Sequence, residues 1–254
     1  MIFEDLKGKR VLVTGASSGI GVALAKAFAG QGCFVGVHYF QTKSGAEETL
    51  AEVKKVSDGC LLCADVRDEG QVGAMVDEFI AAAGGLDVLV NNAGTLIQRR
   101  SFEEASVDEY EDYFATNTRS VFLVTQAALE HLKKSQGNIV NIGSVAGHTG
   151  GAGGSGMYAA AKSAVATMTI GMAKEFAAFG VRVNSVLPGV IETRFHEQFS
   201  TPERLVDIAK QTPVGRNGRA DDLAGAVLLL ASNEAAGFIT GEYIAVNGGI
   251  YMRA

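Results

Sequence analysis

A tyrosine and a lysine four residues apart, Tyr158 and Lys162, have side chains suited to acid–base chemistry. The surrounding stretch, 157–179, has the apolar spacing of a helix, so the two side chains share one helix face. A free tyrosine has a pKa of about 10, too high for a base at neutral pH, and a neighbouring ammonium lowers that pKa. The pair therefore suits proton transfer to or from a carbonyl or alcohol oxygen. Alone, such a pair is more often a solvated helix face.

A glycine-rich turn near the N-terminus has the residues to bind a pyrophosphate. It lies between an expected strand, 9–14, and an expected helix, 19–31. Glycine permits a tight turn and close backbone approach to a phosphate, and the N-terminus of the helix offers free N–H groups. The candidate cofactor-binding residues of this turn are Gly15, Ser17, Ser18, Gly19, Ile20 and Gly21. A purely structural turn is the alternative interpretation.

Strands and helices alternate along the whole sequence. We expect strands at 9–14, 33–39, 60–64, 86–90, 137–142, 181–187 and 243–246. We expect helices at 19–31, 45–56, 69–83, 107–132, 157–179, 202–211 and 220–231. The strands are apolar without alternation, which is typical of strands buried on both faces of a parallel sheet. The sequence therefore predicts an α/β fold, a single domain over 1–254 with a doubly wound parallel sheet of about seven strands and helices on both faces.

Six features of the sequence together resemble the short-chain dehydrogenase/reductase family. The glycine turn has that family's G-x-x-x-G-x-G spacing, and N-N-A-G follows the fourth expected strand. Tyr158 and Lys162 form its Y-x-x-x-K motif, and P-G follows the sixth expected strand. A serine after the fifth strand and an asparagine in the long helix, Ser144 and Asn117, lie where the family has catalytic residues. The similarity runs from about residue 7 to residue 251 and implies a Rossmann-type oxidoreductase with a nicotinamide cofactor.

This resemblance implies a role for each catalytic residue. Tyr158 would be the general acid/base, and Ser144 would hydrogen-bond the substrate oxygen and stabilise charge there. Asn117 would hold a water that links Lys162 to solvent. For Ser144 the alternative is a turn or helix-cap serine, and for Asn117 it is a mid-helix residue that bonds locally.

Further cofactor contacts are also implied by the resemblance. Asp65 and Val66 would hold the adenine edge, and Ile191 and Thr193 would contact the nicotinamide end. The remaining positions expected to touch the cofactor are Asn92, Ala93, Gly94, Tyr158, Lys162, Pro188 and Gly189. The segment 192–218 would cover the substrate.

The end of the second expected strand bears on the choice between NADP and NAD. Enzymes that use NAD usually carry an acid there, which bonds the ribose 2′-hydroxyl. Tyr39 stands at that place, no acid follows before Glu47, and Lys43 lies near enough to bind a 2′-phosphate. We therefore prefer NADP as the cofactor and keep NAD as possible, because Lys43 is also an ordinary loop residue.

The substrate is expected to be a small carbonyl or alcohol compound. The preferred function is an NADPH-dependent oxidoreductase that interconverts a ketone and a secondary alcohol, resembling the 3-oxoacyl-carrier-protein reductase and glucose-dehydrogenase-like members of the family. The alternatives are an NAD-dependent sugar, polyol or other alcohol dehydrogenase and a non-catalytic nucleotide-binding protein.

The glycine-rich loop 148–156 predicts an open or mobile pocket wall, because glycine has no side chain to enclose a substrate. Arg99 and Arg100 could meet an anionic substrate, although solvation is the simpler interpretation.

Composition limits the partners and the compartment. The net charge of −6 argues against nucleic-acid binding, and no apolar stretch approaches the ~20 residues that span a bilayer. The N-terminus lacks signal-peptide features, so we expect a cytoplasmic protein. Cys60 and Cys63 form a C-x-x-C within an expected strand, which we interpret as buried thiols rather than a metal or redox site. Relatives and the apolar tail 248–252 suggest a homotetramer; packing of the tail on its own subunit is the alternative.

Overall fold

Seven parallel strands form one sheet in the order β3-β2-β1-β4-β5-β6-β7 in the computed structural model, which describes residues 2–252, the side chains of 196 and 197 excepted. The strands are β1 (Arg10–Val13), β2 (Phe34–Tyr39), β3 (Asp58–Cys63), β4 (Val88–Asn91), β5 (Asn138–Ile142), β6 (Arg182–Pro188) and β7 (Tyr243–Val246). Strand order reverses between β1 and β4, so the carboxyl ends of these two strands flank a crevice where ligands bind in such sheets. The predicted fold class is confirmed.

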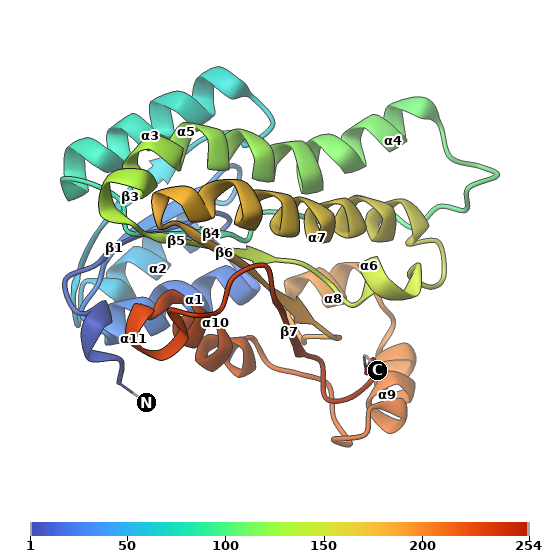
Figure 1. Ribbon diagram of the computed structural model, residues 1–254. Helices are drawn as coiled ribbons and strands as arrows, with labels where there is room; N and C mark the ends of the chain where they lie inside the picture. The colour runs from blue at the N-terminus through green and yellow to red at the C-terminus, as the bar shows by residue number, and fades with distance from the viewer. Residues whose placement is uncertain (1, 253–254) are drawn as a thin grey trace.

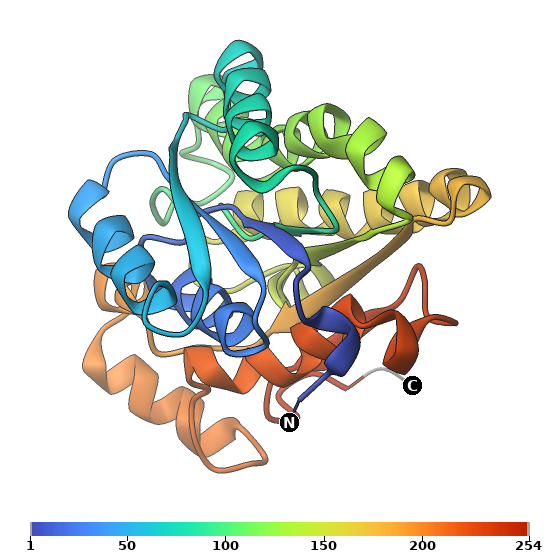
Figure 2. The same ribbon diagram turned by 90° about the vertical axis from the view of Figure 1, so that its left-hand side faces the viewer.

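Helices cover both faces of the sheet (Figure 1). One layer contains α1 (Gly19–Gly30), α2 (Lys43–Val53) and α10 (Ala224–Ala231), and the other contains α3 (Glu69–Ala83), α5 (Ser120–Ser135) and α7 (Gly156–Phe176). Figure 2 shows the sheet between these two layers. The shorter elements are η1 (Glu4–Leu6), α4 (Val107–Phe114), η2 (Ala115–Arg119), α6 (Ala146–Thr149), η3 (Ala177–Phe179), α8 (Arg194–Phe199), α9 (Pro202–Gln211), η4 (Ala220–Leu223) and α11 (Asn233–Ala236).

The central strands are buried on both faces. In β1, Val11 and Val13 face the core under α1, whereas Leu12 faces the core under α3, and none of the three is exposed. Successive strand residues point to opposite sides, so both faces must be apolar when both are covered. This explains why these strands show no polar alternation.

The edge strand β3 departs from that pattern. We expected Cys60 and Cys63 to be buried thiols, but Cys60 is only partly buried and Cys63 is exposed. β3 pairs on one side only, with β2, so its end lacks a covering neighbour. Burial of Cys63 was therefore a wrong prediction. Neither thiol is disulfide-bonded, and the described residues contain no cluster of metal-ligating side chains.

The long helix expected at 107–132 is interrupted. α4 ends at Phe114, a five-residue π-helical segment, η2, follows, and α5 begins at Ser120. A π segment changes the rotation of the residues that follow it, and such segments frequently occur at functional sites. Asn117 lies in its middle with no exposed surface.

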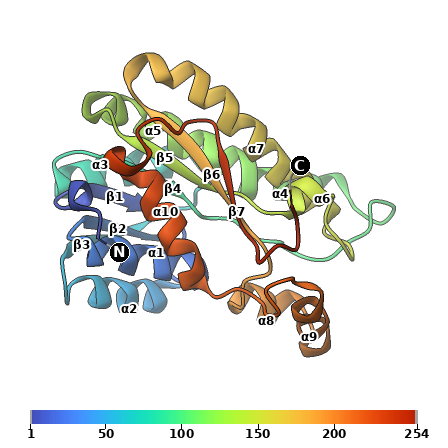
Figure 3. The same ribbon diagram turned by 60° about the horizontal axis from the view of Figure 1, so that its bottom comes forward.

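Two helices stand beyond the carboxyl ends of the strands. α8 and α9 project there together, away from both helix layers (Figure 3). α9 begins with the cap residue Thr201, whose hydroxyl accepts the N–H of Arg204, and Pro202 takes the first helical position. No helix among residues 2–252 is long and apolar enough to cross a membrane.

Candidate active site

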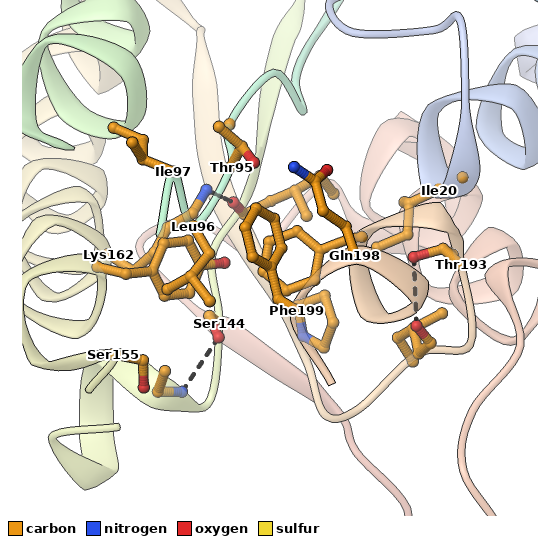
Figure 4. A pocket seen from close by; sticks show the side chains of 18 of the residues that line it. Ile20, Thr95, Leu96, Ile97, Ser144, Ser155, Lys162, Thr193, Gln198 and Phe199 are labelled. Atoms are coloured by element: carbon orange, nitrogen blue, oxygen red, sulfur yellow. Dashed lines mark hydrogen bonds between the residues drawn. The ribbon is translucent and has the colours of Figure 1, made fainter. Parts of the chain in front are cut away.

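A cleft of about 1230 Å³ lies at the carboxyl ends of the strands. The structure brings most of the predicted site residues to its walls: Gly15, Ser17, Ser18, Gly19, Ile20, Asp65, Val66, Asn92, Ala93, Gly94, Ser144, Tyr158, Lys162, Pro188, Gly189, Ile191 and Thr193. Figure 4 shows Ser144 and Lys162 on one wall and Ile20 and Thr193 on the opposite wall. Four predicted residues are not among the lining residues: Gly21, Tyr39, Lys43 and Asn117.

The glycine turn is held against the end of β4. Gly15 has a φ of +66°, and a Cβ there would come within 2.9 Å of the Ala93 Cα. A Cβ on Gly21 would lie 2.2 Å from the Gly15 carbonyl oxygen, so Gly21 shapes the turn from behind. The side-chain amide of Asn92 donates to the carbonyls of Thr14 and Gly15 at 2.9 and 3.0 Å. This narrow turn at the start of α1, where Gly15 and Gly21 leave no room for a Cβ, fits a dinucleotide pyrophosphate.

His38 is a residue of this region that the sequence analysis missed. Its Nδ1 accepts the Gly15 N–H at 3.0 Å, and its Nε2 donates to the Ala64 carbonyl at 3.0 Å. The two partners fix the neutral tautomer, and burial lowers the pKa of the ring. His38 thus ties the glycine turn to the end of β3. No spacing motif marks it; its only signal is a histidine inside an otherwise apolar strand.

The predicted catalytic side chains Ser144, Tyr158 and Lys162 lie together beyond the end of β5 and on the first turns of α7. The Tyr158 hydroxyl lies close enough to Ser144 for that side chain to lower its pKa, and the Ser144 Oγ accepts the Ala146 N–H at 3.1 Å. The Lys162 Nζ donates to the Ile142 carbonyl at 2.9 Å and lies 5.9 Å from the centre of the Tyr158 ring. The bond from the Ala146 N–H shows Ser144 in the turn role of its alternative interpretation, and its expected hydrogen bond to the substrate oxygen stays a prediction.

Burial dominates the titration of this pair. It raises the pKa of Tyr158 to about 12, which the hydrogen bond to Ser144 partly offsets. It also lowers the pKa of Lys162 to about 8, because an ammonium loses its hydration. We expected Lys162 to lower the pKa of Tyr158, but burial raises that pKa in this structure. A protonated Tyr158 is the correct form for donating a proton to a ketone oxygen.

A pH dependence follows from these directions. Tyr158 stays protonated through neutral and mildly alkaline pH, whereas Lys162 loses its charge as the pH rises through about 8. We predict that kcat/KM for ketone reduction is flat below that pH and falls above it, because the role predicted for Lys162 requires its cationic form. The measurement is kcat/KM from pH 6 to 10, and a rate that stays level up to pH 10 would contradict the assignment.

The side chain of Asn117 is occupied by backbone groups. Its Oδ1 accepts the Thr95 N–H at 2.9 Å, and its Nδ2 donates to the carbonyls of Thr95 and Tyr113 at 2.9 and 3.0 Å. A Cβ on Gly94 would lie 2.7 Å from the Asn117 Oδ1 and 3.2 Å from the Lys162 Nζ. Asn117 thus locks the 94–95 turn directly above the Lys162 ammonium. Its expected role in holding a water stays a prediction.

The end of β2 differs in detail from expectation. The Tyr39 ring packs into the core below α1 and α2, and the Lys43 Nζ lies 3.5 Å from the Glu47 carboxylate on the exposed face of α2. The cleft wall is formed instead by Phe40, Gln41, Thr42 and Arg67. Arg67, which the sequence analysis did not single out, bonds Asp65 at 2.7 Å and lies 6.0 Å from the centre of the Phe40 ring.

The other end of the cleft is lined by α8, α9 and the 95–99 turn. The rings of Tyr158 and Phe195 are 6.0 Å apart, and those of Phe195 and Phe199 are 5.2 Å apart. The tail also reaches this cleft through Ile250, and Tyr251 stacks on His148 of the same chain. The tail thus packs largely on its own subunit, although Met252 is exposed.

Comparison with known proteins agrees with this geometry. The family described as enoyl-(acyl carrier protein) reductase matches residues 15–251. The chain is 41% identical to 3-oxoacyl-(acyl-carrier-protein) reductase FabG of Vibrio cholerae, over 98% of this chain and 99% of that one. Against FabG of Escherichia coli K12 it is 39% identical, over 98% and 99% of the two chains.

Solved structures show the same likeness. The NADH-dependent reductase A1-R′ responsible for alginate metabolism superposes with a TM-score of 0.91 at 33% identity, covering 99% of this chain and 100% of that one. A short-chain type dehydrogenase/reductase from Mycobacterium marinum gives a TM-score of 0.93 at 33% identity, covering 99% and 98%. The chain belongs to the short-chain dehydrogenase/reductase family. It is therefore an oxidoreductase of a family that binds NAD or NADP.

Proposed function

We propose that this short-chain dehydrogenase/reductase is an NADPH-dependent reductase of 3-oxoacyl thioesters. The observation that carries the proposal is the grouping of Ser144, Tyr158 and buried Lys162 in the same cleft as the glycine turn. The similarity to 3-oxoacyl-(acyl-carrier-protein) reductases over nearly the whole chain supports the choice of substrate.

Each catalytic residue has a defined task in this proposal. A bound nicotinamide cofactor supplies a hydride to the ketone carbon. Ser144 donates a hydrogen bond to the ketone oxygen and holds it beside the Tyr158 hydroxyl. Tyr158 gives that oxygen its proton, so that the ketone becomes a secondary alcohol. The Lys162 ammonium, anchored on the Ile142 carbonyl, places a positive charge beneath the reacting groups. Asn117 fixes the turn that covers this ammonium.

The preference for NADPH rests on the wall beyond β2. Phe40, Gln41 and Thr42 line it, and none of them carries a negative charge that would repel a 2′-phosphate. The Lys43–Glu47 ion pair is exposed on both sides, and an exposed pair contributes only about 0.2–1 kcal/mol. Lys43 can therefore turn from Glu47 to the phosphate at small cost.

Fluorescence titrations with NADPH and NADH test this choice. We expect NADPH to bind at least about 10-fold more tightly, and Lys43→Gln to remove most of that difference without changing NADH binding, because a charged hydrogen bond to phosphate is lost. Lys55→Gln is the matched control, since Lys55 is also an exposed lysine beside a glutamate but lies away from the cleft. Tighter binding of NADH would contradict the proposal.

The main alternative is an NAD-dependent sugar, polyol or other alcohol dehydrogenase. Two observations favour it: Lys43 points to Glu47 rather than to the cleft, and the similar reductase A1-R′ is NADH-dependent. A preference for NADH in the titrations, together with oxidation of a polyol, would establish it. A non-catalytic nucleotide-binding protein would bind cofactor but reduce no ketone.

Assembly and location complete the proposal. We place the protein in the cytoplasm as one domain, 1–254, with the segment 192–218 covering the substrate; α8 and α9 of that segment line the cleft. We also propose a homotetramer. Its support is apolar surface on two adjoining helices, Phe122 on α5 and Ile170 on α7, which are 47% and 37% exposed.

A further inference from the structure

Two arginines from distant parts of the chain converge at the substrate end of the cleft. Arg99 follows the turn after β4, Arg204 lies in the first turn of α9, and both line the cleft together with Tyr158. The Arg99 Nη1 donates to the Ala152 carbonyl at 3.0 Å, and the Arg204 Nη2 donates to the same oxygen at 3.4 Å. Two guanidinium groups that share one acceptor lie side by side.

No carboxylate neutralises this pair among the described side chains. Among the described residues, the arginines that have a carboxylate oxygen within 4 Å are Arg10, Arg67, Arg100 and Arg216. Arg99 and Arg204 instead bond backbone carbonyls, those of Ala152, Gly153 and Phe199. Burial, and the proximity of Arg204, lower the pKa of Arg99. Half-buried like charges without a counter-ion are unfavourable until an anion joins them.

The glycine-rich loop makes room for the pair. A Cβ on Gly153, whose φ is +57°, would lie 2.7 Å from the Arg204 Nη1. Ser155 braces the loop, because its Oγ accepts the Ala152 N–H and donates to the Ala152 carbonyl, both at 2.9 Å. Arginine side chains from other segments therefore pack against this wall, and its expected mobility stays a prediction. Ser155 also lies three residues before Tyr158, about 4.5 Å along α7.

We propose that Arg99 and Arg204 form an oxyanion-binding subsite of the substrate cleft, and that the substrate carries a carboxylate or phosphate in addition to its ketone. This proposal rests on the proposed reductase function and narrows its substrate class. Each guanidinium has five N–H donors. Arg99 makes three of the described hydrogen bonds and Arg204 makes one, so donors on both remain for a shared anion. Arginine pairs favour planar oxyanions because the donors match in geometry.

Paired substrates, of which one member carries the anionic group and the other does not, test the subsite. They also show whether the anion is a carboxylate or a phosphate. The first pair is 4-oxopentanoate and its methyl ester, with 5-oxohexanoate and its ester as a longer pair. The second is acetoacetyl-4′-phosphopantetheine and acetoacetyl-pantetheine. We expect the wild-type protein to favour the anionic member of at least one pair by about 10-fold or more in kcat/KM. A preference in the first pair identifies a carboxylate, and one in the second identifies a phosphate.

Substitutions of the two arginines distinguish loss of anion binding from a general loss of structure. Arg204→Gln, whose side chain makes only one long hydrogen bond, should lower kcat/KM for the anionic member by about 10-fold and leave the neutral member within about threefold. Arg99→Gln/Arg204→Gln should remove the preference. Arg100→Gln is the matched control, because Arg100 is adjacent in sequence but pairs with Glu109 at 3.2 Å. Absence of any charge preference, or an equal loss on both members, would overturn the proposal.

A binding measurement keeps this test apart from the reductase proposal. Thermal unfolding with 4-hydroxypentanoate and with its methyl ester needs no turnover. A rise in Tm with the acid alone, lost in Arg204→Gln, would support the subsite even if no ketone were reduced, in which case only the proposed function would fail. No rise with the acid, together with turnover of neutral ketones alone, would leave the reductase standing and refute the subsite.

Discussion

Tyr158→Phe is expected to lower kcat for ketone reduction by about 10³-fold, because in the proposed mechanism the phenol gives the substrate oxygen its proton. The ring fills the same space in the variant, and its neighbour Phe195 keeps its contact. Cofactor binding should therefore stay within about twofold, since only a hydroxyl is removed. Steady-state kinetics and a cofactor titration of the same preparation measure both effects.

The neighbouring serine provides the control for this result. Ser144→Ala leaves the Tyr158 hydroxyl in place and removes the neighbouring side-chain hydroxyl. We expect a smaller loss, about 10²-fold, because positioning and charge stabilisation weaken while the proton donor remains. Turnover of Tyr158→Phe close to the wild-type rate would show that the proton comes from elsewhere.

Lys162→Met is expected to lower kcat by about 10²–10³-fold and at the same time to stabilise the fold. Burial lowers the pKa of Lys162 from 10.5 to about 8, so the unfolded chain holds this proton more tightly than the native protein does. At pH 7 the charged, buried ammonium therefore costs roughly 3 kcal/mol of stability. Methionine removes that cost, although the Ile142 carbonyl loses a hydrogen-bond donor worth about 1 kcal/mol.

The stability cost of the buried Lys162 ammonium depends on pH. The penalty on the wild-type protein is fully present below about pH 8 and disappears as the pH rises toward the unfolded value of 10.5. The stability advantage of Lys162→Met in urea unfolding should therefore be largest at pH 7 and shrink by pH 10. A variant that is less stable than the wild type at pH 7, or an advantage that is the same at both pH values, would contradict a buried, charged Lys162.

The bounds of several elements were predictable from sequence. The expected ranges 69–83, 202–211 and 243–246 coincide with α3, α9 and β7. In these segments the apolar spacing and the flanking cap or turn residues agree, as Thr201 and Pro202 show at the start of α9. The parallel sheet was predictable because the central strands are apolar throughout. The predicted burial of Cys63 was wrong because β3 lies at the edge of the sheet, which the local sequence does not reveal.

Features set by distant contacts were not predictable. The π segment at Asn117 places a side chain that bonds Thr95, a residue of another turn, and the spacing of 107–132 does not contain that information. His38 takes its place from partners at the ends of β1 and β3, and Arg67 lies over Phe40, at the end of β2. The meeting of Arg99 and Arg204 depends on how α9 folds back over the glycine-rich loop.

Hydride transfer from cofactor to ketone is the central claim, and isotope transfer tests it most directly. The purified protein would be incubated with acetoacetyl-pantetheine and NADPH deuterated at C4 of the nicotinamide, one C4 epimer at a time, and the hydroxyacyl product analysed by mass spectrometry and NMR. We predict one deuterium on the carbinol carbon from one epimer and none from the other, and loss of this transfer in Tyr158→Phe. A product without deuterium from either epimer, or no product, would contradict the account.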